Sequence, residues 1–135
     1  MSNTALWIVQ GLLAGVFALT GAVKLFVPRE KLEKRMHWAG SWPRWRIRLL
    51  GLAELAGAIG LVVPMVTGIA PGLTAVSALC LAVLMLGAVA THRRLRESVL
   101  PAAIVGVLCL VVAAGRFVPP ARHAPEGQQI SRTAA

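Results

Sequence analysis

The sequence contains no aspartate, and charged residues make up only 14% of its 135 positions. Hydrophobic residues account for 57%. A soluble domain of this length needs more polar surface than this composition supplies, whereas a protein embedded in a bilayer does not. The scarcity of charge therefore excludes an ordinary soluble domain and favours one small integral membrane domain.

Potential metal and redox ligands are also scarce. Of three histidines, only His92 adjoins a long apolar run. Neither a bis-histidine haem site nor a zinc cluster is therefore supported, and we predict no metal. Cys80 and Cys109 would lie at similar depth if the chain turns near Leu95. They form no C-x-x-C motif and have no polar neighbour to stabilise a thiolate. We expect them to pack as small apolar side chains rather than as a redox pair.

What the sequence does contain is four long apolar runs. Each is close to the roughly 20 residues that a helix needs to cross a hydrocarbon core of ~30 Å. They cover residues 6–27, 47–66, 71–91 and 99–118. We therefore predict an all-α fold, an integral membrane four-transmembrane-helix bundle over residues 1–118. Residues 119–135 are rich in Pro, Gln, Gly and Ser and are predicted to form a disordered tail.

Basic residues are distributed unevenly among the connections. Ten of the fourteen lie in or beside the first and third connections, and three lie at or beyond the end of the fourth run. The positive-inside rule then places connections 28–46 and 92–98 in the cytoplasm and both termini outside, in a cell (inner or plasma) membrane. The net charge of +9 thus follows topology, and no nucleic-acid partner is predicted.

The first connection contains a short amphipathic segment. Leu32 and Met36 are four residues apart, and Glu30 and Lys34 have the spacing of a helical ion pair. Downstream, arginines alternate with aromatic rings, a composition typical of a membrane interface. The rings belong to Trp38, Trp42 and Trp45. We expect this segment to lie on the membrane surface.

Glu54 is the only carboxylate inside an apolar run. A charge at the centre of a span costs about 2.5 to 3.5 kcal/mol, so such a residue usually faces a protein interior or a wet cavity. Gly51, Ala58 and Leu61 fall on its helical face, where a neighbouring helix can approach closely. Three glycines are the candidate helix-packing positions: Gly51, Gly57 and Gly60.

Two further polar residues lie at comparable depth on other helices. At about 1.5 Å per residue, Lys24 is about 5 Å deep, Glu54 about 10 Å, and His92 close to the interface. The three side chains could surround one cavity. The alternatives are a structural role for Glu54, and a helix-end cap or a metal ligand for His92. Lys24 is either a partner of Glu54 or a snorkelling anchor. Arg116 is likewise expected to snorkel outward, with a contact to Gln10 as the alternative.

These residues also carry a resemblance to a known family. Gly21, Lys24 and Pro28, the pattern Gly51, Glu54, Gly57, Gly60 and Pro64, and finally His92 resemble the DoxX-like family over roughly residues 5–117. The resemblance implies a small four-helix membrane protein in which Lys24, Glu54 and His92 form a shared polar site. Members are linked to quinone-dependent sulfur oxidation, to membrane complexes that handle oxidative stress, and to assembly of other membrane proteins.

Three classes of function are compatible with this pattern. The leading hypothesis is a polar cavity around Glu54 that binds a lipophilic molecule such as a quinone, with Glu54 exchanging a proton and Lys24 or His92 adjusting the local charge. The protein would then be a membrane oxidoreductase subunit or an acid-base enzyme. The second is a scaffold that assembles with a membrane protein partner or with copies of itself. The third is a small proton-coupled transporter.

Overall fold

The computed structural model describes residues 2–70 and 72–117, apart from the side chains of His37 and Trp38. All regular secondary structure in this part of the chain is helical, and four of its helices are long and apolar enough to cross a membrane. The helices are α1 (Asn3–Phe26), α2 (Arg29–Arg35), the short 3-10 helix η1 (His37–Ser41), α3 (Arg44–Thr67), α4 (Gly72–Arg94) and α5 (Leu100–Phe117). The predicted all-α membrane bundle is confirmed. The predicted tail, 119–135, lies outside the described residues.

Prolines and one glycine determine where several helices begin and end. α1 ends at Phe26, just before Pro28, because a residue that precedes proline is disfavoured in helical conformation. Pro43 comes directly before α3. That helix is closed by Gly68, whose φ of 70° lies in the left-handed region that glycine adopts without strain. These residues fix the lengths of the spans.

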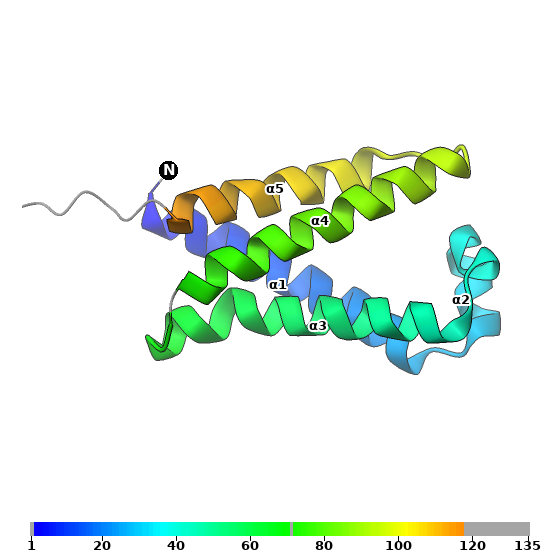
Figure 1. Ribbon diagram of the computed structural model, residues 1–135, viewed down its shortest axis with the longest axis horizontal. Helices are drawn as coiled ribbons and strands as arrows, with labels where there is room; N and C mark the ends of the chain where they lie inside the picture. Colours follow the sequence, from blue (N-terminus) through cyan, green and yellow to red (C-terminus); the bar gives the residue numbers. More distant parts are fainter. Residues whose placement is uncertain (1, 71, 118–135) are drawn as a thin grey trace, which may run out of the picture.

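The four long helices form two antiparallel pairs, α1 with α3 and α4 with α5 (Figure 1). The backbones of α1 and α3 meet at two glycines, where a Cβ on Gly51 would lie 2.8 Å from the carbonyl oxygen of Gly21. α3 contacts α4 through the other two predicted helix-packing glycines, Gly57 and Gly60. Gly57 faces Leu81, and Gly60 faces Ser77 so closely that a Cβ there would overlap the hydroxyl.

The two pairs are in contact near the N-terminus of α1 and separate toward α2 (Figure 1). The end that holds α2, η1 and the connection between α4 and α5 carries most of the basic residues. We call it the basic end and the other the opposite end. The bundle is therefore narrow at the opposite end and wide at the basic end.

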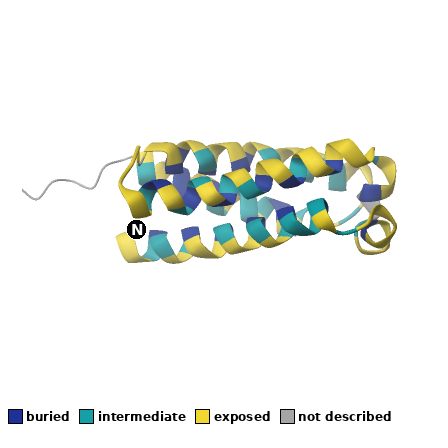
Figure 2. Cartoon of the chain, turned by 90° about the horizontal axis from the view of Figure 1, so that it is seen from below, coloured by how far each residue is buried: buried dark blue, intermediate teal, exposed yellow. Residues whose placement is uncertain are grey.

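Apolar residues occupy both the inside and the outside of the bundle. Buried positions face inward on every long helix, while the outward faces are exposed (Figure 2). Exposed side chains include Leu12, Leu19 and Val83, which are 67%, 68% and 61% accessible. Apolar surface on this scale around spanning helices is the surface that lipid tails cover. The chain is thus a multi-pass membrane protein in contact with the bilayer.

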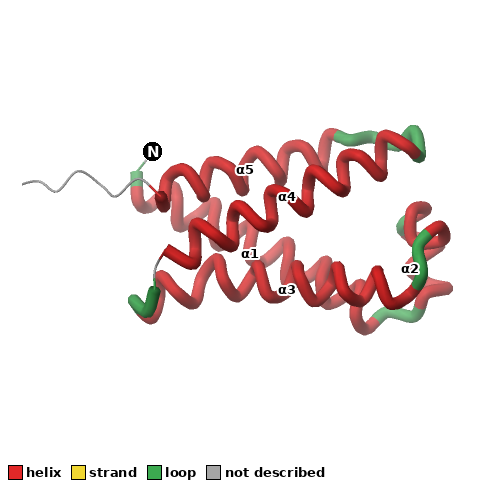
Figure 3. The backbone as a smooth tube through the Cα atoms, in the orientation of Figure 1, coloured by secondary structure: helices red, strands yellow, loops and turns green. Residues whose placement is uncertain are grey.

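The connection between α1 and α3 folds back as α2 and η1 at the basic end (Figure 3). Leu32, only 2% exposed, packs against Ile47 with Met36 and Trp42 beside it. The ion pair in α2 joins Arg29 and Glu33, with Nε and Oε1 2.9 Å apart. This is the predicted spacing of four residues, one position earlier than the expected pair of Glu30 and Lys34.

The aromatic residues of this connection have different surroundings. Trp42 is partly buried, whereas Trp45 is 60% exposed and has the guanidinium of Arg46 5.2 Å from its ring centre. Stacking of this kind suits a membrane interface, where ring and guanidinium are both partly wet. The side chain of Trp38 lies outside the described part of the chain.

The charge asymmetry makes a testable prediction about orientation. In a background with Cys80 and Cys109 replaced by alanine, Ser41→Cys and Arg94→Cys should react with an impermeant thiol reagent from the cytoplasmic side. Ser2→Cys and Ser131→Cys should react from outside. The extent of labelling of each variant is compared between intact cells and inverted vesicles. Reaction of Ser41→Cys in intact cells would reverse the proposed topology.

Candidate functional site

Glu54 lies on the inward face of α3 and is only 2% exposed. The buried residues of this helix recur at the spacing of one helical face: Ile47, Gly51, Glu54, Ala58, Leu61 and Pro64. All four residues that the sequence analysis assigned to the Glu54 face are among them. The carboxylate therefore points into the bundle rather than toward lipid.

Lys24 of α1 is the ion-pair partner of Glu54. Its Nζ donates to both carboxylate oxygens, at 2.6 Å to Oε1 and 2.8 Å to Oε2. The Thr20 hydroxyl, one turn earlier on α1, donates to Oε2 at 3.0 Å. In the structure, Lys24 is thus a partner of Glu54 and does not snorkel toward the headgroups. Thr20 was not predicted as a site residue, although it shares the face of Lys24.

The crossing of α1 and α3 explains why these side chains meet. Lys24 lies beyond Gly21 toward the basic end, and Glu54 lies beyond Gly51 toward the opposite end. In a helix each Cα–Cβ bond leans toward the N-terminus. α1 and α3 run antiparallel (Figure 1). The two side chains therefore lean toward each other across the glycine contact.

Burial of this pair has an energetic consequence. Lys24 is 7% exposed and Glu54 2%. Removing such charges from water is costly, and the cost is offset only where the geometry is good and further hydrogen bonds satisfy the remaining lone pairs. The bidentate contact and the Thr20 hydroxyl provide that compensation. Loss of either partner would leave a buried charge without its counterion.

His92 lies near the C-terminal end of α4 and is bonded to the following connection. Its Nδ1 is 2.8 Å from Oε2 of Glu97, and its carbonyl oxygen accepts from the Glu97 backbone N–H at 2.9 Å. About a quarter of the imidazole is accessible, at 27%. Glu97 was not assigned a role from the sequence. Its approach depends on the turn at Arg96, which has a φ of 57°.

One cavity of about 510 Å³ lies between the two helix pairs toward the basic end. Its polar lining comes from Thr20, Lys24, Glu54, Thr91 and His92. Most of the remaining wall is apolar, from all four long helices and from Met36 and Trp42 of the first connection. Toward the opposite end the space is filled by a buried core that includes Phe17, Leu61 and Leu81. The three site residues that the sequence analysis named thus border the same space.

The sequence of this four-helix bundle is similar to a known protein family. The sequence matches the model of the DoxX-like family over residues 8–115. The chain belongs to the DoxX-like family. No curated protein and no solved structure matches it. The family thus accounts for all four spans of this DoxX-like chain and names no substrate for the cavity.

A second polar cluster lies at the opposite end of the DoxX-like bundle. Arg116 Nε donates to Gln10 Oε1 at 2.9 Å, and Arg116 Nη1 donates to Asn3 Oδ1 at 2.8 Å. The amide nitrogen of Gln10 donates to the Leu61 carbonyl of α3, in the turn that precedes Pro64. Of the two expectations for Arg116, the structure has the contact with Gln10 in place of a side chain that only snorkels outward. Buried Gln10 offers it an acceptor within reach.

The cysteines of this DoxX-like chain do not form a disulfide. Cys80 is exposed on the outside of α4, and Cys109 is buried in the core of the bundle. Their predicted similarity in depth does not bring them together, because they occupy different faces. Within the described ranges, no three metal-ligating side chains cluster.

Proposed function

We propose that this DoxX-like protein binds a lipophilic molecule with a carbonyl or hydroxyl group, such as a quinone, beside Lys24 and Glu54. The observation that supports the proposal is a buried ion pair on the wall of a largely apolar cavity of about 510 Å³. That volume is within the range of about 300 to 1,000 Å³ typical of small-molecule sites, which usually combine apolar walls with a few polar groups.

The residues fit a quinone-like ligand in two respects. Apolar walls from four helices suit a ring and an isoprenoid tail, and Lys24 is a donor that a carbonyl oxygen can accept from. Several lining residues also reach the lipid-facing surface, among them Val16 and Val83 at 45% and 61% exposure. A molecule dissolved in the bilayer would therefore enter without crossing water.

The proposed chemistry is proton exchange linked to redox or acid-base turnover. A ligand oxygen that accepts from Lys24 Nζ competes with the carboxylate for the same donor. Glu54 is then the group that takes up a proton from the ligand or returns one, in reach of the reacting oxygen. His92, at the edge of the same cavity, lies between this pair and the basic end and would pass the proton onward.

Identification of co-purifying molecules tests the binding proposal. We expect protein extracted in mild detergent to carry a lipophilic carbonyl or quinol compound in near-stoichiometric amount, detected by mass spectrometry. Bulk phospholipid alone would count against the proposal. A tightly bound membrane protein in place of a small molecule would favour the scaffold, and proton-driven flux in vesicles would favour the transporter.

A glycine that lines the cavity offers a matched variant. Gly87 borders the cavity, and a Cβ added there would meet no atom within 4 Å, so Gly87→Leu should enter the space without a backbone clash. We expect ligand affinity to fall at least about tenfold, equivalent to about 1.4 kcal/mol. Gly15→Leu is the control, because Gly15 is equally unobstructed and does not line the cavity. Equal affinities in the two variants would show that the ligand binds outside this cavity.

A further inference from the structure

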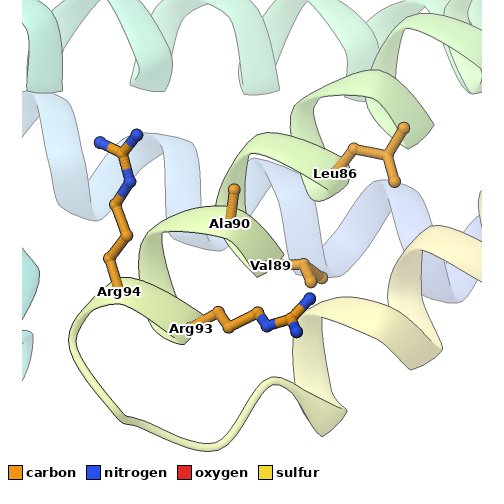
Figure 4. A pocket seen from close by; sticks show the side chains of 5 residues that line it. All are labelled: Leu86, Val89, Ala90, Arg93 and Arg94. Carbon is orange, nitrogen blue, oxygen red and sulfur yellow. The ribbon is translucent and has the colours of Figure 1, made fainter.

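A shallow hollow lies on α4 at the basic end, apart from the cavity (Figure 4). It is formed by one helical stripe, with apolar Leu86, Val89 and Ala90 followed by Arg93 and Arg94, and has a volume of about 450 Å³. The two arginine side chains extend in different directions on either side of Ala90 (Figure 4). The hollow thus has an apolar floor and two cationic groups at one end.

Among the described residues, none balances the charges of Arg93 and Arg94. Neither side chain forms a hydrogen bond or ion pair with any described residue. The nearby carboxylates have other partners, since Glu33 pairs with Arg29 and Glu97 with His92. Both guanidiniums are therefore available to an anion from outside the described chain.

The arginines are also not needed to cap α4. The carbonyl oxygens of its last turn accept backbone N–H groups from the connection that follows. Leu95 donates to Thr91 at 3.1 Å and Arg96 donates to Arg93 at 3.3 Å. A capping role, the usual structural explanation for basic residues at a helix C-terminus, is thereby already filled by the backbone.

We infer that this hollow binds one anionic phospholipid, with the headgroup phosphate at the end of the stripe that holds Arg93 and Arg94 and the start of an acyl chain over Ala90, Val89 and Leu86. A guanidinium fork matches phosphate oxygens in geometry and charge. From Arg93 to Leu86 is seven residues, about 10 Å along the helix, the distance from a headgroup to the upper acyl chain. The 68% exposure of Leu86 leaves that floor open to the lipid.

The apolar floor of the hollow favours a phospholipid over a free anion as the ligand. A soluble phosphate would contact only the arginines, whereas a phospholipid covers the whole stripe. The binding is independent of the cavity beside Glu54, because none of the five residues of the hollow lines that cavity. Failure of the proposed quinone-like ligand would leave the lipid site unaffected.

Native mass spectrometry of the full chain, exchanged into detergent with phosphatidylglycerol or phosphatidylcholine, tests the inference. We expect one phosphatidylglycerol to be retained in preference to phosphatidylcholine. Because Arg93→Gln with Arg94→Gln removes the charge-assisted hydrogen bonds to the phosphate, the double variant should weaken retention at least about tenfold. Ala90→Trp, which fills the hollow without changing charge, should also remove the retained lipid.

The matched control removes two charges at the same end of the bundle. Lys31 and Lys34 are exposed on α2, and their double replacement by glutamine should leave the retained lipid in place. An equal loss in both double variants would indicate only a diffuse field and overturn the site. Retention by Ala90→Trp, or displacement by inorganic phosphate as readily as by lipid, would also overturn it.

Discussion

We expect Gly51→Leu to prevent assembly of the bundle. The backbones of α1 and α3 touch here, and even a single Cβ on Gly51 would lie 2.8 Å from the Gly21 carbonyl oxygen and 3.0 Å from Lys24 Cβ. A backbone oxygen cannot move aside without separating the helices. Overpacking a close contact costs about 1 to 3 kcal/mol for small additions, and a leucine adds far more volume than that.

The milder Gly51→Ala makes the same prediction measurable. It should lower stability by about 1 to 3 kcal/mol in an SDS titration of detergent-solubilised protein. Gly57→Ala should cost less, because the atoms it meets, Leu81 Cδ2 at 2.5 Å and Cγ at 2.7 Å, belong to a side chain and not to a backbone. Gly15→Ala, with open space around it, is the neutral control. A Gly51→Ala protein as stable as the control would show that α1 and α3 do not cross at these glycines.

The second large effect is expected from the buried ion pair. Lys24→Met and Glu54→Gln should each destabilise the fold by about 3 to 5 kcal/mol, since each leaves a charge buried without its counterion. The double variant should recover most of that loss, because it removes both charges. A double-mutant cycle on the four proteins measures the coupling between the two side chains.

The double variant also separates folding from function. If Lys24 and Glu54 contact the ligand, a protein with Lys24→Met and Glu54→Gln should be stable and yet fail to bind it. Gly15→Ala lies outside the cavity and is the control, because it should keep both stability and ligand affinity. A double variant that keeps wild-type affinity for the co-purified molecule would exclude the pair from the binding site and leave it a purely structural contact.

The inward face of α3 was predictable because burial along a helix is periodic and local. Gly51, Glu54, Ala58 and Leu61 follow from residue spacing alone. The same spacing on α1 put Lys24 at a suitable depth but left its direction open. That direction depends on where the two helices cross. The crossing point, at Gly21 and Gly51, is set by how α1 and α3 pack together and cannot be read from either segment alone.

Contacts between residues distant in sequence were the hardest to predict. The contact of Arg116 with Gln10, 106 positions away, was expected only as the alternative, because no local pattern encodes the alignment of α5 with α1. Glu97 reaches His92 through a left-handed backbone conformation at Arg96, a residue type that rarely adopts it. Sequence reasoning therefore recovered faces and depths, and the structure supplied the partners.

The taper of the bundle also affects the surrounding bilayer. The helix pairs converge at the opposite end and spread at the basic end, where α2 and η1 add further width (Figure 1). Such a body takes up more cross-sectional area in one leaflet than in the other. Lipids accommodate it with the least elastic cost where the leaflet on the wide side is expanded, that is, where the membrane bulges toward the basic end. We therefore expect the spreading that makes room for the cavity to favour membranes that curve toward the basic end.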